Sequence, residues 1–278
     1  MSDIIKWFRT DEQKTVLREE YQRQRAVIQD LRQVLTEAPP YTSFGDGEDW
    51  GNFPLTPARR LLKFQLTDLT AGVRGPNGAD PALFVGIMLR ATGKTITNMA
   101  CAAAVAATEE VGDGAGPMTV DLFYEAIGIL NSGTPGPCAM VLTPKAYNEF
   151  QESLRGERDA ATFNPATKEQ LSASWGSYRG SWRNVRIYVT DKVDISDNGD
   201  VAQNFMFVRN GIRYVEHRDD RLITNFFACN PNNIIDLGDL VLTMDYSAQK
   251  NECSVIAHHW PALSLGEDPA VVRIQTAT

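Results

Sequence analysis

Few residues of this chain belong to the types that bind metals, carry redox chemistry or cross membranes. Its 278 residues include only four cysteines and three histidines. No two cysteines form a Cys-x-x-Cys pair, so we expect reduced, buried thiols of the kind found in proteins made in a cytoplasm. No apolar run reaches the roughly 18 residues of a transmembrane helix, and the first residues do not resemble a secretory signal. The sequence therefore predicts no membrane partner.

Basic residues are outnumbered by acidic ones. Lysine and arginine together number 27, against 35 aspartates and glutamates, which gives a formal net charge of −8. Non-specific binding to nucleic acid normally requires clustered lysine and arginine, so the whole molecule is expected to be a poor DNA ligand. Hydrophobic residues make up 43% of the chain, which is enough to build one large core or two smaller ones.

Nucleotide-binding motifs are also missing. Gly93-Lys94-Thr95 resembles the end of a phosphate-binding loop, but that loop needs a glycine five positions before Gly93, and Met88 stands there. The glycine pattern of a dinucleotide-binding fold is absent as well. We therefore expect no cofactor.

The residues that could support other chemistry are poorly placed for it. His258 and His259 are adjacent, so on a strand they face opposite sides of the sheet and cannot share one metal ion. The run His-Arg-Asp-Asp at 217–220 is better explained as a charged strand end, and the acids of 45–49 as a solvated turn without spaced calcium ligands. Cys138 lies in an apolar run, where thiols are packed and inert. We predict no catalytic, cofactor-binding or metal-binding residues, and no enzymatic activity.

Residues 1–40 are predicted to form a separate helical arm that Pro39-Pro40 ends. Its apolar stripe recurs at spacings of four and three, as in a coiled-coil seam, and consists of Leu17, Tyr21, Gln24, Ile28, Leu31 and Leu35. A helix with one thin apolar stripe needs a partner surface, which is either its own domain or a neighbouring subunit. We expect this arm to matter more for assembly than for folding of the rest of the chain.

The segment 41–79 has no single clear pattern. Residues 56–72 fit a capped helix, while 61–67 also fit an alternating strand, and both interpretations stay open. A turn is expected at 75–78. From residue 80 to 110 the chain is expected to be helical, with an alanine-rich second half that lets other backbone pack closely against it.

Residues 117–155 contain the most informative pattern. Thr119 can cap a helix whose apolar stripe runs to Leu130, and two prolines and two glycines then turn the chain within 131–137. Residues 138–142 are typical of a short buried strand. Thr143-Pro144 has the cap and the first-turn proline that begin a second helix. The segment therefore predicts a helix–turn–strand–helix unit.

The remainder of the chain is expected to be mostly β-structure. The patterns predict a surface loop at 160–179, a strand at 182–190 and further strands at 240–246, 253–257 and 271–274. The last of these either closes a sheet edge or reaches a neighbouring molecule. Asn210-Gly211 favours a primed turn, which predicts a hairpin of 205–208 with 212–216. Helices early in the chain and strands late in it predict an α+β fold.

Three segments resemble the major capsid proteins of tailed phages with the Hong Kong 97-type fold. The unit at 117–147, with its Pro-Gly-Pro turn and Leu-Thr-Pro exit, is similar to the axial (A) domain of that family. Residues 255–263, which include Ala-His-His and a proline, are similar to its late strand, and 176–189 to the strand before the A-domain hairpin. The expected helix at 80–110 matches the family's long spine helix by its position.

This resemblance implies a complete layout for the chain. It implies an N-terminal arm helix at 1–40, an extended-loop region at 41–79, a peripheral domain with the spine helix at 80–116, an axial domain with a central sheet at 117–230, and returning strands of both domains at 231–278.

The resemblance also implies a function without catalysis. The chain would assemble with itself, as hexamers and pentamers, into the icosahedral capsid of a virion, formed in the host bacterial cytoplasm around double-stranded DNA. A portal at one vertex, scaffold and cement proteins, and DNA held non-specifically on the inner face are the implied partners. An encapsulin-like bacterial nanocompartment shares this architecture, and a soluble enzyme with an unrecognised site is a further alternative.

Overall fold

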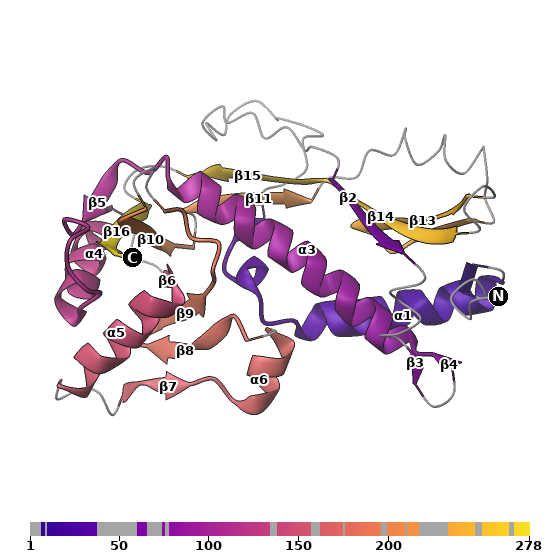
Figure 1. Ribbon diagram of the computed structural model, residues 1–278, viewed down its shortest axis with the longest axis horizontal. Helices are drawn as coiled ribbons and strands as arrows, with labels where there is room; N and C mark the ends of the chain where they lie inside the picture. The colour runs from indigo at the N-terminus through magenta and orange to yellow at the C-terminus, as the bar shows by residue number, and fades with distance from the viewer. Residues whose placement is uncertain are drawn as a thin grey trace. The chain divides into compact units, whose positions relative to one another are not determined.

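The structure, a computed structural model, describes residues 7–8, 10–37, 60–65, 74–75, 78–133, 138–156, 162–174, 176–195, 199–209, 211–216, 233–247, 252–266 and 270–278. Helices and several sheets are both present, which confirms the predicted α+β class (Figure 1). The chain forms two compact units, each made of three separate segments. Unit 1 consists of Met1–Ile28, Thr56–Thr92 and Glu216–Ala262, and unit 2 of Gln29–Leu55, Gly93–Val215 and Leu263–Thr278.

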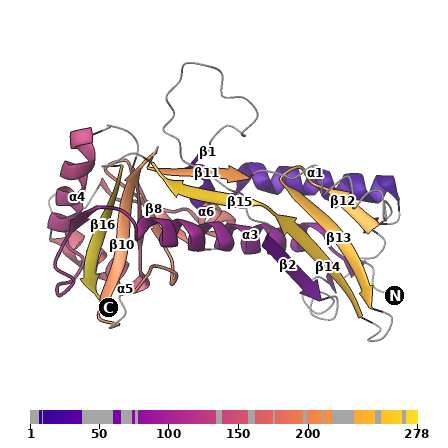
Figure 2. The ribbon, with the colours of Figure 1, turned by 90° about the horizontal axis from the view of Figure 1, so that it is seen from above.

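Unit 1 contains a four-stranded antiparallel sheet in the order β12-β13-β14-β2 (Figure 2). Its strands are β12 (Ile234–Asp236), β13 (Leu240–Ser247), β14 (Glu252–His259) and β2 (Arg60–Gln65). Residues 56–72 were expected to form either a helix or, at 61–67, a strand, and the presence of β2 confirms the strand. Cross-strand partners share a face of the sheet, and the row through Ile235, Leu242 and Ala257 is fully buried.

Helix α1 (Asp11–Val27) begins at Thr10, whose hydroxyl accepts the Gln13 N–H at 3.3 Å. The predicted helix through residue 40 is therefore too long, because Ile28 is extended and a short 3-10 turn, η2 (Leu31–Gln33), follows. The Asp30 carboxylate, which accepts the Arg32 N–H at 3.1 Å, starts this new turn. Pro39-Pro40 lies outside the described residues.

The predicted apolar stripe of the arm is nonetheless correct. Five of its members are buried within the chain itself: Leu17, Tyr21, Ile28, Leu31 and Leu35. The first three belong to unit 1 and the last two to unit 2. The arm thus packs on its own chain, which is the first of the two alternatives.

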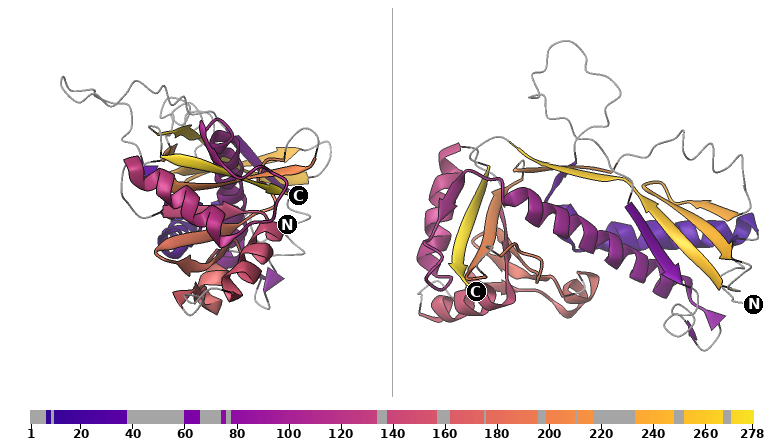
Figure 3. Two further views of the ribbon diagram at one scale, coloured as in Figure 1. Left: turned by 90° about the vertical axis from the view of Figure 1, so that its left-hand side faces the viewer. Right: turned by 45° about the horizontal axis from the view of Figure 1, so that its top comes forward.

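Unit 2 is built on a seven-stranded mixed sheet in the order β5-β16-β10-β6-β9-β8-β7. The strands are β5 (Glu109–Val111), β6 (Cys138–Leu142), β7 (Asn164–Pro165), β8 (Tyr178–Trp182), β9 (Val185–Val189), β10 (Val201–Val208) and β16 (Val271–Ala277). Figure 3 shows β16, in yellow, beside β10, in orange. The prediction that the last strand closes an edge is wrong, because β16 lies between β5 and β10.

Helices cover both faces of this sheet. On one face, Met140, Leu142 and Met206 pack with α4 (Val120–Gly133) and α5 (Pro144–Arg155). On the other face, the alternate residues Val141 and Phe205 pack with the second part of the long helix α3 (Pro81–Ala104). Strands buried on both sides are continuous apolar runs, which explains the sequence of β6.

The alanine-rich helix ends earlier than predicted. α3 stops at Ala104, and residues 109–111 form β5 instead of the expected last helical turn. At the helix end, the Ala106 N–H donates to the Ala103 carbonyl oxygen and the Ala107 N–H to that of Ala104. This spacing of three residues is that of a tighter 3-10 turn. β5 then pairs in parallel with β16. Sheet pairing here overrides the helical propensity of the sequence.

The predicted hairpin at Asn210-Gly211 is wrong. β10 pairs with β16 and β6, whereas β11 (Ile212–Glu216) lies between β1 (Thr36–Glu37) and β15 (Pro261–Leu265) in a separate three-stranded sheet. Gly211 has no positive φ, and a Cβ there would collide with the carbonyl oxygen of Ala270. This glycine therefore serves close packing, not a primed turn.

A turn of the primed kind occurs instead between β8 and β9, where the sequence has no glycine. Arg183 and Asn184 have φ angles of 47° and 66° and join β8 to β9, with Trp182 paired to Val185. The expected single strand at 182–190 is thus the second half of a hairpin. The expected loop at 160–179 contains β7 and helix α6 (Lys168–Ala173), which the Thr167 capping box begins.

The turn expected at 75–78 agrees with the small hairpin of β3 (Arg74–Gly75) and β4 (Gly78–Ala79). Of the expected extended-loop region at 41–79, residues 41–59, 66–73 and 76–77 lie outside the described part of the chain.

Candidate functional site

The helix–strand–helix predicted at 117–155 is present as α4, β6 and α5. Thr119 caps α4 by accepting the Leu122 N–H at 3.3 Å, and Thr143 caps α5 by accepting the Ala146 N–H at 3.1 Å. Pro144 occupies the first turn of α5. Each boundary thus forms where the cap and proline pattern predicts it. The Pro135–Pro137 turn lies outside the described residues.

Side chains of α5 also accept hydrogen bonds from backbone amides at the start of α4. The N–H of Met118 donates to the Glu149 carboxylate of α5 at 2.9 Å, and the N–H of Val120 donates to the Ser153 hydroxyl at 3.1 Å. The first amides of a helix have no partner within it. Side chains of α5 therefore fix where α4 begins.

An aromatic group holds α4, α5 and the β8–β9 hairpin together. The ring centroids of Phe123 and Trp182 are 4.6 Å apart, and Phe150 lies 5.6 and 5.7 Å from them. All three are fully buried. Arg183 places its guanidinium 5.4 Å from the Tyr124 ring centroid and 5.6 Å from that of Trp182, so its charge covers the outer edge of this group.

The buried face of the second half of the long helix consists mainly of small residues, as the sequence predicts. Ile96, Ala100, Cys101 and Ala104 are buried against the seven-stranded sheet, while Ala102 is exposed. Small side chains let the helix approach the sheet closely. Burial, and after it the negative charge of Asp194, raises the pKa of the Cys101 thiol to about 12, so this cysteine stays protonated and inert.

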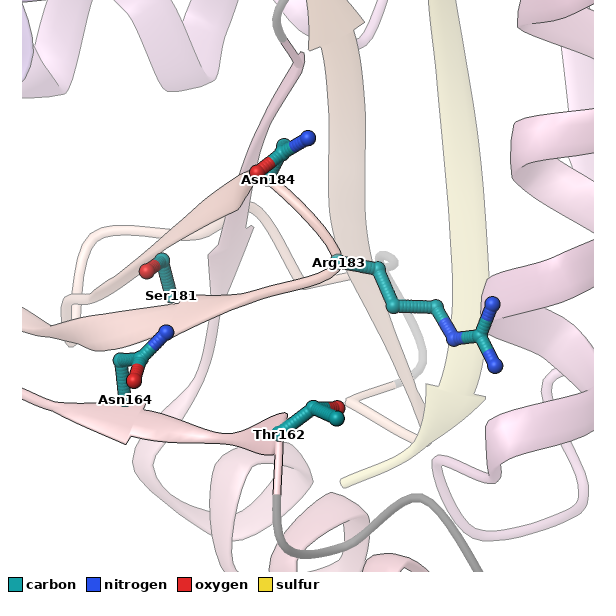
Figure 4. A pocket seen from close by; sticks show the side chains of 5 residues that line it. All are labelled: Thr162, Asn164, Ser181, Arg183 and Asn184. Carbon is teal, nitrogen blue, oxygen red and sulfur yellow. The ribbon is translucent and has the colours of Figure 1, made fainter.

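A polar hollow opens at the β7–β8–β9 edge of the sheet (Figure 4). It measures about 380 Å³ and is lined by Thr162, Asn164, Ser181, Arg183 and Asn184. In Figure 4 the Arg183 side chain extends away from the other four. The remaining lining groups are uncharged amides and hydroxyls, and nothing in their arrangement activates a nucleophile or a proton donor.

Unit 1 contains a cluster of ionisable groups that no sequence motif indicated. Nε2 of His259 lies 2.7 Å from Oε1 of Glu216, and the Tyr21 hydroxyl donates to Asp239 Oδ1 at 2.7 Å. Arg25 is 3.4 Å from both carboxylates. These side chains come from α1, β11, β14 and the turn after β12. Tyr21 and Arg25 of α1 lie more than 190 residues from their carboxylate partners in the sequence, so only the fold brings them together.

The comparisons with known proteins are structural only. No protein-family model matches the sequence, and no curated protein matches it. Several solved structures share its architecture. They are viral and compartment shells.

The head structure of Helicobacter pylori bacteriophage KHP40 is 9% identical, with a TM-score of 0.49, and the match covers 86% of this chain and 81% of that chain. Mycobacterium phage Che8 is 12% identical over 78% and 70% of the two chains, with a TM-score of 0.48. An encapsulin complex from Synechococcus elongatus is 16% identical over 88% and 85%, with a TM-score of 0.49. At these values the likeness is one of architecture and carries no argument about function.

Those residues that resemble functional motifs and are described lie inside regular helices and strands. Gly93, Lys94 and Thr95 lie in the interior of α3, where the backbone amides are already bonded and cannot wrap a phosphate. Cys138 lies in β6, as expected, although its side chain is outside the described set. Residues 45–49 and 217–220 are also outside it.

The two adjacent histidines face opposite sides of β14, as predicted. His258 Nε2 lies 2.7 Å from the Thr243 hydroxyl, while His259 points to Glu216. In the described part of the chain, no group of three or more His, Cys, Asp or Glu side chains is placed to hold a metal ion. No described helix is both long and apolar enough to span a membrane.

Proposed function

We propose that this protein is the major capsid protein of a tailed bacteriophage. Copies of the chain would assemble as pentamers and hexamers into the icosahedral head that encloses the double-stranded DNA genome. The observation that carries this proposal is the unit α4-β6-α5. It was identified by its resemblance to the A domain of Hong Kong 97-type subunits, and it forms with the predicted caps on the sheet whose other face holds the long helix.

The construction of unit 2 suits a shell subunit. Helices on both faces of a seven-stranded sheet give a stiff body, because side chains pack on both sides of each central strand. A subunit that joins many copies needs contacts that are individually modest, since the closed shell gains its stability from their number. Rigid subunits with modest contacts allow wrongly placed copies to dissociate before closure.

The charge of the chain suits a container for DNA. A net charge of −8 disfavours tight binding of nucleic acid, so packaged DNA would touch the inner face only non-specifically. A portal at one vertex, and scaffold and cement proteins, would complete the particle. The protein would act without catalysis and without a membrane, and it would be assembled in the host bacterial cytoplasm.

The test is whether the purified full chain forms closed particles. We would measure sedimentation velocity and negative-stain images of the chain alone and with the scaffold and portal of the same phage. We expect closed shells with fivefold and sixfold clusters of subunits. A folded chain that remains monomeric at every concentration, in both conditions, would overturn the proposal, and circular dichroism of the same sample shows that it is folded.

The contents of the particle separate the phage head from an encapsulin-like compartment. Particles isolated from cells would be treated with nuclease, and their nucleic acid and protein then extracted. Protected double-stranded DNA together with a portal is expected for a head. A packaged enzyme without DNA would identify a compartment shell, and the tailed-phage assignment would then be wrong.

A further inference from the structure

Helix α3 exposes a stripe that is apolar at its start and basic further on. Leu83 and Ile87 are 46% and 38% exposed, and the next exposed residues of the helix are Arg90 and Lys94. Spacings of four, three and four residues keep these side chains on one face of the helix. The two cations are the only charged residues in the sequence of α3. An acidic surface with room for an apolar side chain would complement this stripe.

The exposed face of α4 has the opposite charge. It contains Asp121, Tyr124, Glu125 and Gly128. The two acids are the only charged residues in the sequence of α4. The Tyr124 side chain between them is 39% exposed, and aromatic residues of this kind are enriched in protein–protein interfaces. This face therefore suits a basic partner with apolar side chains.

Gly128 leaves a gap in the exposed face of α4. A Cβ added to this residue would meet no described atom within 4 Å, so packing within the described part of the chain does not require glycine here. Glycine inside a helix also lowers stability relative to alanine. What glycine provides is space in which a side chain of a second helix can lie close to the α4 backbone.

The seven-stranded sheet separates the two helices within one chain. The second half of α3 packs on the face that includes Val141, whereas α4 packs on the face that includes Met140. Figure 2 shows β16 and β10 between α4 and α3. The complementary charges of the two helices can therefore meet only between different molecules. Contacts of α3 with α3, or of α4 with α4, would place like charges together.

The spacing of the two faces matches when the helices run antiparallel. In α3, the steps from Ile87 to Arg90 and from Arg90 to Lys94 are three and four residues. In α4, the steps from Gly128 back to the first and then to the second acid are also three and four residues. Because each residue advances a helix by about 1.5 Å, three pairs of residues come level at the same time.

We propose that α3 of one copy of the chain packs antiparallel on α4 of a second copy. The contact consists of three pairs, which are Ile87 over Gly128, Arg90 beside Glu125, and Lys94 beside Asp121. It joins two different surfaces head to tail, and such contacts form a ring when the rotation between copies closes. The inference rests on the proposed self-assembly and deepens it by naming the surfaces that join.

Charge reversal in the full chain tests this contact. Glu125→Arg places a cation beside Arg90, so association measured by sedimentation velocity over a concentration series should weaken by about tenfold or more. Arg90→Glu should weaken it to a similar extent. The chain with both substitutions should associate within about threefold of the wild type, because the pair is restored with its charges exchanged. Glu152→Arg, the same reversal on the exposed face of α5, is the matched control and should leave association unchanged.

Chemical cross-linking tests the register without any substitution. A zero-length carbodiimide joins an amine directly to a carboxylate that it touches. We would apply it to particles assembled from a mixture of isotope-labelled and unlabelled chains. We expect Lys94 to be joined to Asp121 in peptides of mixed isotope content, which shows that the bond links two copies.

Gly128→Leu gives a further test, because the new side chain fills the space that Ile87 requires. Association should weaken, while the subunit remains folded and thermal unfolding is not lowered, since leucine favours helix more than glycine does. Particles that lack the cross-link and tolerate these substitutions would overturn the contact and leave the proposed function standing. Weakened association in both single variants without recovery in the double variant would refute the pairing of Arg90 with Glu125. A folded wild-type chain that never associates would overturn both the contact and the function.

Discussion

At the residue scale, Asn204 is a buried polar side chain that links three elements of unit 2. It is fully buried in β10, its Oδ1 accepts the Thr143 N–H at 2.8 Å, and its Nδ2 donates to the Thr276 hydroxyl at 2.9 Å. One amide thereby joins β10, β16 and the start of α5. Both an acceptor and a donor are needed at this position, and asparagine supplies them in a single side chain.

We expect Asn204→Ala to destabilise the protein by about 1–3 kcal/mol, since it leaves a buried amide and a buried hydroxyl without partners. Thermal and urea unfolding measure this loss. Gln203→Ala, on the opposite face of the same strand and partly exposed, is the matched control and should change stability by less than about 0.5 kcal/mol. Equal effects of the two substitutions would show that the amide bonds contribute nothing.

Asn204→Asp adds a pH dependence to the same site. The new carboxyl oxygen would replace the amide nitrogen that lies 3.4 Å from the Ile274 carbonyl oxygen, so its ionised form would be repelled. Its pKa would be raised, and stability would fall as the pH rises through that pKa. Unfolding at about pH 4.5 and pH 8 should therefore differ more in Asn204→Asp than in the wild type. The absence of any added pH dependence would refute this expectation.

The structural roles of some single residues can be predicted from the sequence, and those of others cannot. The alternation of a strand was enough to place His258 and His259 on opposite faces. Thr119, Thr143 and Pro144 carry local signals for helix starts, and these predictions are confirmed. Glu216 and Asp239 could not be assigned, because their partners lie far away in sequence and acidic residues are common in this chain. Tyr21, a hydroxyl within an apolar stripe, was the one available signal.

At the element scale, α1 packs within its own chain. Leu17 is fully buried, while its neighbour Val16 is 48% exposed. We expect Leu17→Ala to cost about 2–5 kcal/mol through lost packing and a cavity, and Val16→Ala to be nearly neutral. The expectation that the arm serves assembly more than folding stays a prediction, and these two variants test it. If Leu17→Ala left thermal unfolding unchanged but reduced particle yield, the original expectation would stand.

The second element-scale prediction concerns α3. Ala104 is buried against the seven-stranded sheet, and Ala102, half a turn away, is exposed. Ala104→Leu should overpack this contact and cost about 1–3 kcal/mol. Ala102→Leu should be almost neutral, because leucine and alanine both favour helix. Chemical denaturation of the two variants gives the comparison, and similar stabilities would mean that the helix does not pack closely there.

Element types were more predictable than element boundaries and partners. The periodicity of α3, α4 and α5 and the apolar run of β6 have local causes, so sequence is sufficient for them. The end of α3 depends on the pairing of β5 with β16. The need for glycine at 211 depends on its close contact with Ala270. Both involve segments more than fifty residues apart, which no local pattern describes. The Arg183-Asn184 turn was missed because neither residue is the glycine that usually marks it.

At the scale of the whole molecule, the chain passes repeatedly between its two units. The six segments alternate, so neither unit is a continuous piece of sequence. α3 is a single helix whose residues 81–92 belong to unit 1 and residues 93–104 to unit 2. Helix formation is cooperative along the backbone. Loss of structure in one unit therefore extends directly into an element of the other.

We accordingly expect one calorimetric transition, not two. Leu17→Ala in unit 1 and Ala104→Leu in unit 2 should each lower the temperature of that same transition, by several degrees for each kcal/mol lost. Scanning calorimetry at several scan rates measures this. Two separated peaks, each moved by only one of the variants, would show that the units unfold independently.

The inner position of β16 also governs when a newly made chain can fold. β10 and β5 are synthesised long before residues 271–277, yet β16 must be inserted between them to complete the sheet. Until residues 271–277 have been translated, the growing chain lacks the strand that pairs with both β10 and β5. Strand pairing across such sequence distances is also slow. A polypeptide that terminates before these residues cannot form β16. Incomplete chains that lack these residues are thus left without the finished sheet of unit 2.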